Sequence, residues 1–214
     1  MVMGFSVSVQ AALVDMNNDG TIYDTATQLS WLKNTNTAGT PMTWSQAVAW
    51  AASLNTGSGF AGLTGWRLPA TTEPDATCSL QYNLGGSFPL QGYAYSCTGS
   101  EMGYLYYVSL GNVAGGPLTN TGPFTNMQTG PYWSGTVYAP QPASNAWHFQ
   151  FYGGVQDTND QLANYYAWAV RPGARTIGGG SASTPVGYSP QWLMITFVSL
   201  TLVGGILLRR RMLR

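Results

Sequence analysis

Oxygen-bearing side chains recur near the start of the chain, in the segment DMNNDGTIYD at residues 15–24. Three of them occupy alternate positions before a glycine, which is how an EF-hand-type loop begins to hold calcium. The bidentate acid expected at the twelfth loop position is missing, because Ala26 stands there. The Asn-Asp-Gly run also favours a tight turn, so we expect a hairpin first and a calcium site second. The calcium ligands would be Asp15, Asn17, Asp19 and Asp24.

Cys78 and Cys97 are the only two cysteines of the chain. In an exported protein such a pair forms a disulfide, which would close a loop of about 20 residues and contribute roughly 3 kcal/mol. The alternative is a pair of catalytic thiols, but no cation that would activate a thiolate lies nearby in the sequence. The sequence therefore predicts a disulfide between Cys78 and Cys97.

The single histidine, His148, is the side chain that titrates nearest to neutral pH. It lies in the alternating segment AWHFQF, on the opposite side from Trp147 and Phe149, so we expect it to be exposed or hydrogen-bonded. The chain contains no glycine-rich phosphate loop, no zinc-ligand spacing and no nucleophilic serine elbow. We therefore predict no catalytic residue and expect a function without catalysis.

Tyrosines and side-chain amides gather in glycine-rich segments. Tyrosine rings stack on sugar rings while Asn and Gln bind hydroxyl groups, so a surface for carbohydrate or matrix polymer is chemically reasonable. Alternatively, these rings fill the core of a loop-rich domain, which we expect for more than half of them. The tyrosines are Tyr82, Tyr93, Tyr95, Tyr104, Tyr132, Tyr138, Tyr152 and Tyr165.

Charged residues make up only 7% of the chain, which is more typical of exported proteins than of cytosolic enzymes. Four of the eight basic residues lie in the last six positions, so the rest of the chain has four bases against eight acids, a net charge of −4. This acidic body offers no attraction for phosphate groups. We expect no nucleic-acid partner.

Residues 192–208 carry no charge and are followed at once by arginines. As a helix they would span about 25 Å, so we predict a transmembrane anchor over residues 191–208, with residues 209–214 as a cytoplasmic basic tail. The alternative is a buried C-terminal core helix. The stretch 176–190, rich in Gly, Ser and Pro, predicts a flexible linker. The residues flanking the anchor are Trp192, Arg209, Arg210 and Arg211.

Residues 1–12 are mildly apolar and place small residues ahead of a candidate signal-peptidase cut. We interpret them as the remnant of a signal peptide, with an ordinary first strand as the alternative. A chain anchored by its C-terminus needs its body exported. The expected location is the periplasmic face of a bacterial inner membrane, or the cell surface after sorting.

The body between residues 13 and 175 predicts one α+β domain. Thr43 and Gln46 form a capping box before an apolar helical pattern, which predicts a helix that ends near Asn55 or Gly57. The other segments are short and β-type, separated by Gly, Pro and Asn. The expected strands lie within residues 20–24, 29–33, 104–110, 131–139, 146–154 and 165–173.

The ordered motifs NDGTIYDTATQLSWL, GWRLPATTE, YWSGT, AWHFQFYGG and NYYAWAVR resemble the C-terminal domain of bacterial collagen-like adhesins, from about residue 13 to residue 171. This resemblance implies a loop-rich C-type-lectin-like fold, with short antiparallel strands and one or two helices, shared with sulfatase-modifying enzymes. The tail is similar in layout to exosortase sorting signals, although Pro-Glu-Pro is absent and Ser-Pro-Gln-Trp stands near its place. That similarity implies an exosortase-type processing enzyme as a partner.

The WRLP motif places an aromatic ring and a guanidinium side by side before a proline. Trp66 is expected to be buried, and Arg67 to hydrogen-bond carbonyl groups or a carboxylate, with Glu73 as a partner for Arg67 or Arg171. The segment WAVR alternates as a central strand with one buried face would. The residues predicted to be structural are Trp66, Arg67, Leu68, Pro69, Trp133, Trp168 and Arg171.

Taken together, these features predict an exported, membrane-anchored surface module that binds carbohydrate or extracellular polymer without catalysis. Two other functions stay open at this point. One is an enzyme related to the formylglycine-generating sulfatase-modifying factors, and the other is a purely structural matrix protein.

Overall fold

The computed structural model describes residues 12–15, 18–82 and 91–174. The predicted signal-peptide remnant up to residue 11, the linker, the anchor and the basic tail lie outside these ranges. Within the described ranges, no helix has the length and apolar character that crossing a membrane requires.

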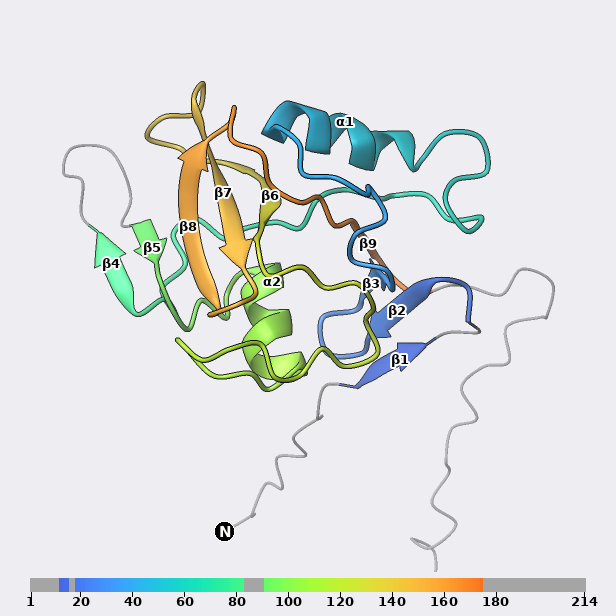
Figure 1. Ribbon diagram of the computed structural model, residues 1–214, viewed down its shortest axis with the longest axis horizontal. Coiled ribbons are helices and arrows are strands. Elements are labelled where there is room, and N and C mark those ends of the chain that lie inside the picture. The colour runs from blue at the N-terminus through green and yellow to red at the C-terminus, as the bar shows by residue number, and fades with distance from the viewer. Residues whose placement is uncertain (1–11, 16–17, 83–90, 175–214) are drawn as a thin grey trace, which may run out of the picture. The chain divides into compact units, whose positions relative to one another are not determined.

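The larger sheet has four antiparallel strands in the order β1-β2-β3-β9. The first three, β1 (Leu13–Asp15), β2 (Thr21–Asp24) and β3 (Leu29–Leu32), follow one another as hairpins. The fourth, β9 (Val170–Pro172), comes from the far end of the described chain and pairs with β3. The fold therefore brings the start and the end of the domain together in one sheet (Figure 1).

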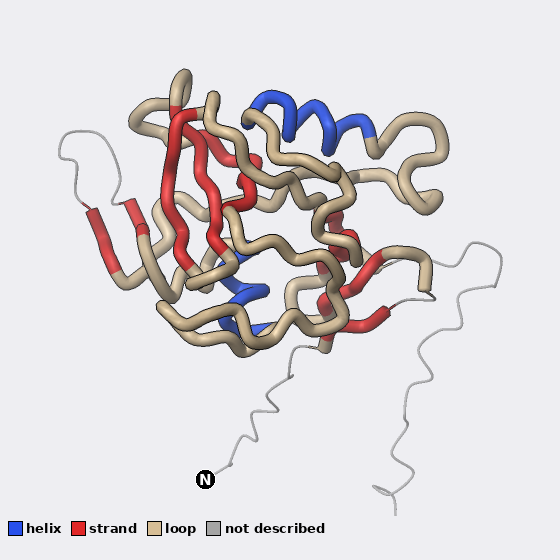
Figure 2. The backbone as a smooth tube through the Cα atoms, viewed as in Figure 1, coloured by secondary structure: helices blue, strands red, loops and turns tan. Residues whose placement is uncertain are grey.

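The second sheet contains β6 (Pro131–Val137), β7 (Asn145–Gln150) and β8 (Val155–Asp160), all antiparallel. A short hairpin of β4 (Leu80–Tyr82) and β5 (Gln91–Tyr93) lies beside β8. Ala94 and Gln156 exchange two backbone hydrogen bonds of 2.9 and 2.8 Å, which join the hairpin to that sheet. Figure 2 shows that loops connect these elements over much of the chain.

The helix α1 (Trp44–Ser53) begins at the predicted capping box. The backbone N–H of Thr43 donates to Oε1 of Gln46 at 3.0 Å, which satisfies a donor that the helix itself leaves unpaired. Ala47 and Ala51 are buried against β6, as the apolar pattern predicts. The prediction of this helix is confirmed, although it ends a little earlier than expected, at Ser53.

The segment 104–110 is not a strand as predicted. It belongs to a helix, α2 (Glu101–Tyr104), which continues as the π-helical turn η1 (Leu105–Ser109). The strand prediction relied on the β-preference of tyrosine and valine. The buried side chains instead recur at helical spacing, and the core against which they pack favours the helix. They are Met102, Leu105, Tyr106 and Leu110.

Tyrosine, tryptophan and phenylalanine dominate the core. Trp168 is fully buried and packs against Trp31 of β3 at a ring-centroid distance of 4.8 Å and against Phe124 at 4.9 Å. Phe149 of β7 and Phe151, just after that strand, continue the cluster and contact Tyr106. Large rings with few rotatable bonds bury much apolar area for little lost side-chain entropy, which suits a domain with short strands.

The segment 165–173 forms a strand only over its last part, β9. Val170 pairs with Trp31 on one side and exchanges two 2.9 Å backbone hydrogen bonds with Arg67 on the other. Ala169 is buried as completely as Trp168 and Val170, so both faces of this segment are covered. The expectation of a single buried face is therefore wrong, because loop residues close over the second face.

Candidate functional site

The Asn-Asp-Gly loop at the front of the chain forms the predicted hairpin, with β1 and β2 paired on either side. Asp15 forms an ion pair with Lys33 at 2.6 Å. The carboxylate of Asp19 accepts hydrogen bonds from the N–H and hydroxyl of Thr21 at 2.9 and 2.6 Å. Asp15 also accepts the N–H of Asn18 at 3.1 Å, so both carboxylates stabilise the turn, which is their usual role in such loops.

Asp24 does not join these acids, contrary to the prediction that it completes a calcium site. It is fully buried, and its carboxylate accepts a hydrogen bond of 2.6 Å from the hydroxyl of Ser109 in η1. Among the described residues, Asp15, Asp19 and Asp24 do not form a cluster that could hold a metal. Asn17 lies outside the described ranges. The strand register explains the separation, because Asp24 is directed by its place on β2 towards the core.

The WRLP motif is structural, and Arg67 is its central residue. The guanidinium forms a two-pronged pair with Glu101, with N–O distances of 2.7 and 2.6 Å. These hydrogen bonds raise the pKa of Arg67, partly against the effect of burial. The same carboxylate accepts the backbone N–H of Ala70 at 2.7 Å. Arg67 thereby ties the four-stranded sheet to the start of α2.

The expected partner of Arg67 or Arg171, Glu73, is engaged elsewhere. Its carboxylate accepts the backbone N–H of Ala139 at 3.1 Å. Arg171 donates instead to the carbonyl oxygens of Thr64 and Gly173, at 2.8 and 3.1 Å. Sequence reasoning missed Glu101, because it lies 34 residues beyond Arg67 and begins a helix that was predicted to be a strand.

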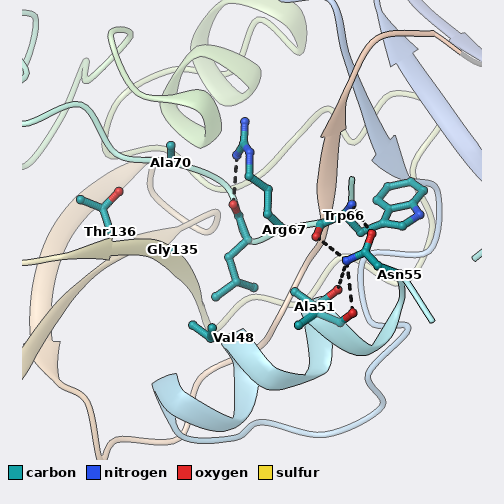
Figure 3. Close-up of a pocket in the computed structure, with 10 residues that line it drawn as sticks. Val48, Ala51, Asn55, Trp66, Arg67, Ala70, Gly135 and Thr136 are labelled. Atoms are coloured by element: carbon teal, nitrogen blue, oxygen red, sulfur yellow. Dashed lines mark hydrogen bonds between the residues drawn. The ribbon is translucent and has the colours of Figure 1, made fainter. Parts of the chain in front are cut away.

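Asn55 holds the WRLP segment against the end of α1, and sequence reasoning did not single it out. Its Oδ1 accepts the N–H of Trp66 at 2.8 Å, and its Nδ2 donates to the carbonyl of Trp66 at 2.9 Å. The same Nδ2 lies 3.3 and 3.2 Å from the carbonyl oxygens of Ala51 and Ala52 (Figure 3). Asn55 thus satisfies carbonyls that the helix end leaves free.

An apolar groove of about 330 Å³ runs between α1, the WRLP segment and β6. Val48 belongs to the apolar face of α1 but is 39% exposed, because it borders this open groove. The one charged group along the groove, the guanidinium of Arg67, is already paired with Glu101. The groove therefore presents small apolar side chains and few free polar groups (Figure 3).

The remaining structural tryptophans are buried as predicted, and each indole N–H has a partner. Trp66 donates to Leu63, Trp133 to Met42 and Trp168 to Leu32, all through carbonyl oxygens at 2.7 to 2.9 Å. Leu68 and Pro69 are also buried. These side chains therefore pack within the body of the domain.

His148 is buried, contrary to the expectation that it is exposed or hydrogen-bonded. Only 3% of its surface is exposed, and its ring packs between those of Trp133 and Tyr165. Nδ1 has no hydrogen-bond partner. Burial lowers the pKa of His148 to about 4, so the ring is neutral near pH 7. The sequence alternation placed it correctly on the second face of β7, but that face is covered as well.

The predicted disulfide between Cys78 and Cys97 is present. Cys78 precedes β4 and Cys97 follows β5, so the bond closes the base of this hairpin. Gln156 of β8 donates to Sγ of Cys78 at 3.5 Å and to the carbonyl of Gly92 at 3.2 Å. The disulfide therefore closes the hairpin, and the hydrogen bonds of Gln156 hold its base against the three-stranded sheet.

A second depression lies where this hairpin meets β8, and we call it the tyrosine cleft. It is an open cleft of about 470 Å³. The β4-β5 hairpin supplies one wall, β8 supplies the other, and the residue after β6 contributes a third ring. Its lining residues are Leu80, Tyr82, Tyr93, Ala94, Tyr138, Val155, Gln156, Asp157 and Thr158.

The aromatic rings of the cleft are arranged in depth. Trp147 is buried, and the rings of Tyr93 and Tyr138 pack on it at centroid distances of 5.0 and 5.7 Å. Tyr82 lies at the rim with 62% of its surface exposed, next to Leu80 at 59%. A rigid aromatic floor with exposed apolar groups at the rim is typical of a ligand site.

Polar groups reach the same cleft from β8. Asp157 accepts the backbone N–H of Thr158 at 2.8 Å, and burial raises the pKa of Asp157 above its ordinary value. Burial and a hydrogen bond with Tyr138 also raise the pKa of Tyr93, so the phenol of Tyr93 is neutral. The cleft thus offers hydroxyl groups and one carboxylate beside aromatic faces. Sequence reasoning missed β8, because VQDTND lacks apolar alternation.

The eight tyrosines divide between core and surface roughly as expected. Tyr132 and Tyr138 are buried, and Tyr93, Tyr104 and Tyr165 are partly buried. The exposed members are Tyr82, Tyr95 and Tyr152. The flanks of the predicted anchor, Trp192 and Arg209 to Arg211, lie outside the described residues.

The comparisons with known proteins agree with the motif order. No curated protein and no solved structure matches the chain significantly. The family model of the Lcl C-terminal domain, the C-terminal domain of collagen-like adhesins, matches residues 20–171, which include both the WRLP segment and the tyrosine cleft. The chain therefore belongs to the Lcl C-terminal domain family and carries a surface-associated, adhesin-like domain.

Proposed function

We propose that this protein is an exported, surface-anchored adhesion module that binds a hydroxyl-rich polymer of the cell envelope or the extracellular matrix. The observation that carries the proposal is the tyrosine cleft, where exposed Tyr82 and partly buried Tyr93 stand beside the polar groups of β8. Aromatic faces with neighbouring hydroxyl and carboxylate groups suit a sugar, which has both apolar and hydroxyl-bearing faces.

The proposal includes a function without catalysis. The single histidine is buried with its pKa lowered to about 4, which leaves it without access to a substrate. Both cysteines are bonded to each other and so provide no thiolate nucleophile. These two groups would be the first candidates for the chemistry of a sulfatase-modifying enzyme, and neither is free.

We further propose a C-type-lectin-like arrangement for the domain and membrane attachment through residues 191–208. The first is supported by the short antiparallel strands, the two helices and the disulfide at the base of a hairpin. The second is supported by the uncharged stretch followed by three arginines. The exosortase-like layout of the tail makes a processing enzyme a candidate partner.

The test uses the full chain in mild detergent on an array of glycans and matrix proteins, together with fractionation of the producing cells. Binding to at least one array member and recovery with the envelope fraction are expected. Absence of binding to every glycan and matrix protein would refute the adhesion function. Oxygen-dependent modification of a peptide thiol, lost in the Cys78→Ser variant, would favour the enzymatic alternative instead.

A further inference from the structure

We infer that the tyrosine cleft selects its ligand by charge, binding uncharged saccharides and rejecting anionic polysaccharides. This inference rests on the proposed adhesion function and adds the chemical class of the ligand. It concerns the described part of the cleft, which three segments distant in sequence assemble around the rings of Tyr82, Tyr93 and Tyr138.

The aromatic part of the cleft is prepared for a sugar ring. Trp147 fixes Tyr93 and Tyr138 from behind, so neither ring has to be ordered on binding. Tyr82 at the rim remains largely exposed and can cover the second face of a ligand. The volume of about 470 Å³ lies within the range of small-ligand sites.

The charge of the cleft points to an uncharged ligand. Asp157 is its one ionisable side chain besides the tyrosines, and none of the lining residues is Lys, Arg or His. A sulfate or carboxylate placed in this cleft would lose its water and meet a carboxylate without gaining a cation. A hydroxyl group, by contrast, can donate to the carboxylate of Asp157 or bond to a tyrosine hydroxyl.

The rest of the described domain strengthens this discrimination. It contains three cations, Lys33, Arg67 and Arg171, and all eight acids of the chain, a net charge of −5. Lys33 and Arg67 are paired with acids, and Arg171 donates to backbone carbonyls. No described cation is therefore free to attract a polyanion, and the overall field repels one.

The test measures binding of the full chain, in mild detergent, to two kinds of hexasaccharide by calorimetry. The neutral probes are maltohexaose and N-acetylchitohexaose, and the anionic probes are hexagalacturonate and a heparin hexasaccharide. We expect at least one neutral probe to bind about tenfold or more tightly than either anionic probe. The Asp157→Asn variant should narrow that difference, since it removes the repelling charge.

The position of the site is tested with two exposed tyrosines. Tyr82→Ala should weaken binding of the neutral probe by about tenfold, as loss of an aromatic anchor does. Tyr152→Ala is the matched control, because Tyr152 is 58% exposed and does not line the cleft, and should change affinity less than about twofold. Equal effects of the two variants would overturn the assignment of the site.

The outcomes separate this inference from the proposed function. Tight binding of an anionic probe that Tyr82→Ala weakens, with weak binding of the neutral probes, would overturn the charge selection while leaving adhesion intact. Binding to a matrix protein without binding to any saccharide would have the same meaning. No binding to either class would overturn both.

Discussion

The WRLP region and the tyrosine cleft use polar groups in opposite ways. Around WRLP, the guanidinium of Arg67, the carboxylate of Glu101 and the amide of Asn55 bind one another or the nearby backbone. In the cleft, the exposed ring of Tyr82 and the partly buried ring of Tyr93 stand beside the carboxylate of Asp157, which accepts the N–H of Thr158. The first region has used its hydrogen-bonding capacity internally, whereas the second, in the function that we propose, keeps part of it for a ligand.

The difference shows that a motif with chemically rich residues need not be a functional site. WRLP contains a cation and an aromatic ring side by side, yet each has a structural partner, and the adjoining groove offers small apolar groups. The segments of the cleft contain no recognisable motif. Changes at WRLP should therefore reduce stability and spare binding, and changes at the cleft should do the reverse.

Removal of the disulfide should have the largest effect, and it should reduce both the stability of the domain and its binding of saccharide. The double variant Cys78→Ser and Cys97→Ser is expected to lower the free energy of unfolding by about 3 kcal/mol, since it frees a loop closed over 19 residues. Because the bond closes the hairpin that forms one wall of the tyrosine cleft, saccharide affinity should fall as well. Urea denaturation measures the stability, and calorimetry measures the affinity. An unchanged affinity would show that the hairpin keeps its place without the disulfide.

Acid should destabilise the core near WRLP through His148. Its pKa is about 4 when folded and near 6.5 when unfolded, so the unfolded chain takes up a proton first as pH falls. The contribution of neutral His148 to the free energy of unfolding is therefore fully present above about pH 6.5. It decreases by roughly 3 kcal/mol as the pH falls towards 4.

The His148→Phe variant keeps a ring between Trp133 and Tyr165 and removes the titration. Urea midpoints at pH 7 and pH 4 should differ less in this variant than in the unaltered chain, since the carboxylates titrate in both. Equal pH dependence in the two proteins would indicate that His148 binds a proton as readily in the folded state as in the unfolded state.

Truncation of Asn55 tests the clamp between α1 and WRLP. Asn55→Ala should lower the free energy of unfolding by about 2 kcal/mol, because it leaves the N–H and carbonyl of Trp66 without their partner. Asn55→Asp keeps the acceptor for that N–H but turns a carboxylate oxygen towards the carbonyl oxygens that Nδ2 now bonds, at the C-terminal end of a helix, so it should destabilise the domain at least as much as Asn55→Ala. Saccharide affinity should stay unchanged, and a marked loss would break the contrast between the two regions.

The smallest effect is expected at Glu101. Glu101→Gln should lower the free energy of unfolding by about 1 kcal/mol, because Arg67 is partly exposed and solvent screens the lost charge. The difference between the two proteins should shrink in 1 M salt, which screens the ion pair of the unaltered chain. A difference that stays constant with salt would assign the effect to hydrogen-bond geometry, not to charge.

The elements that the sequence predicted correctly are those with local causes. The capping box at Thr43 begins α1 because its two partners are three residues apart, and the hairpin at the front follows from its Asn-Asp-Gly turn. The segment 104–110 was mistaken for a strand because tyrosine and valine favour strands, and packing against the core favours the helix instead. The strand β8 has no apolar alternation that would predict it. It forms because its backbone pairs with β7 and, through Ala94, with the end of the β4-β5 hairpin.

The sequence by itself determined the family, the disulfide pair, the burial of the tryptophans and the acidic charge of the body. Each of these depends on residue types, on their order, or on spacing within a few residues. Only the tertiary structure decided that Glu101 pairs with Arg67, that Asp24 turns into the core and that the tyrosine cleft exists. Those contacts join segments far apart in the chain, and strand register together with the disulfide sets which side chains meet.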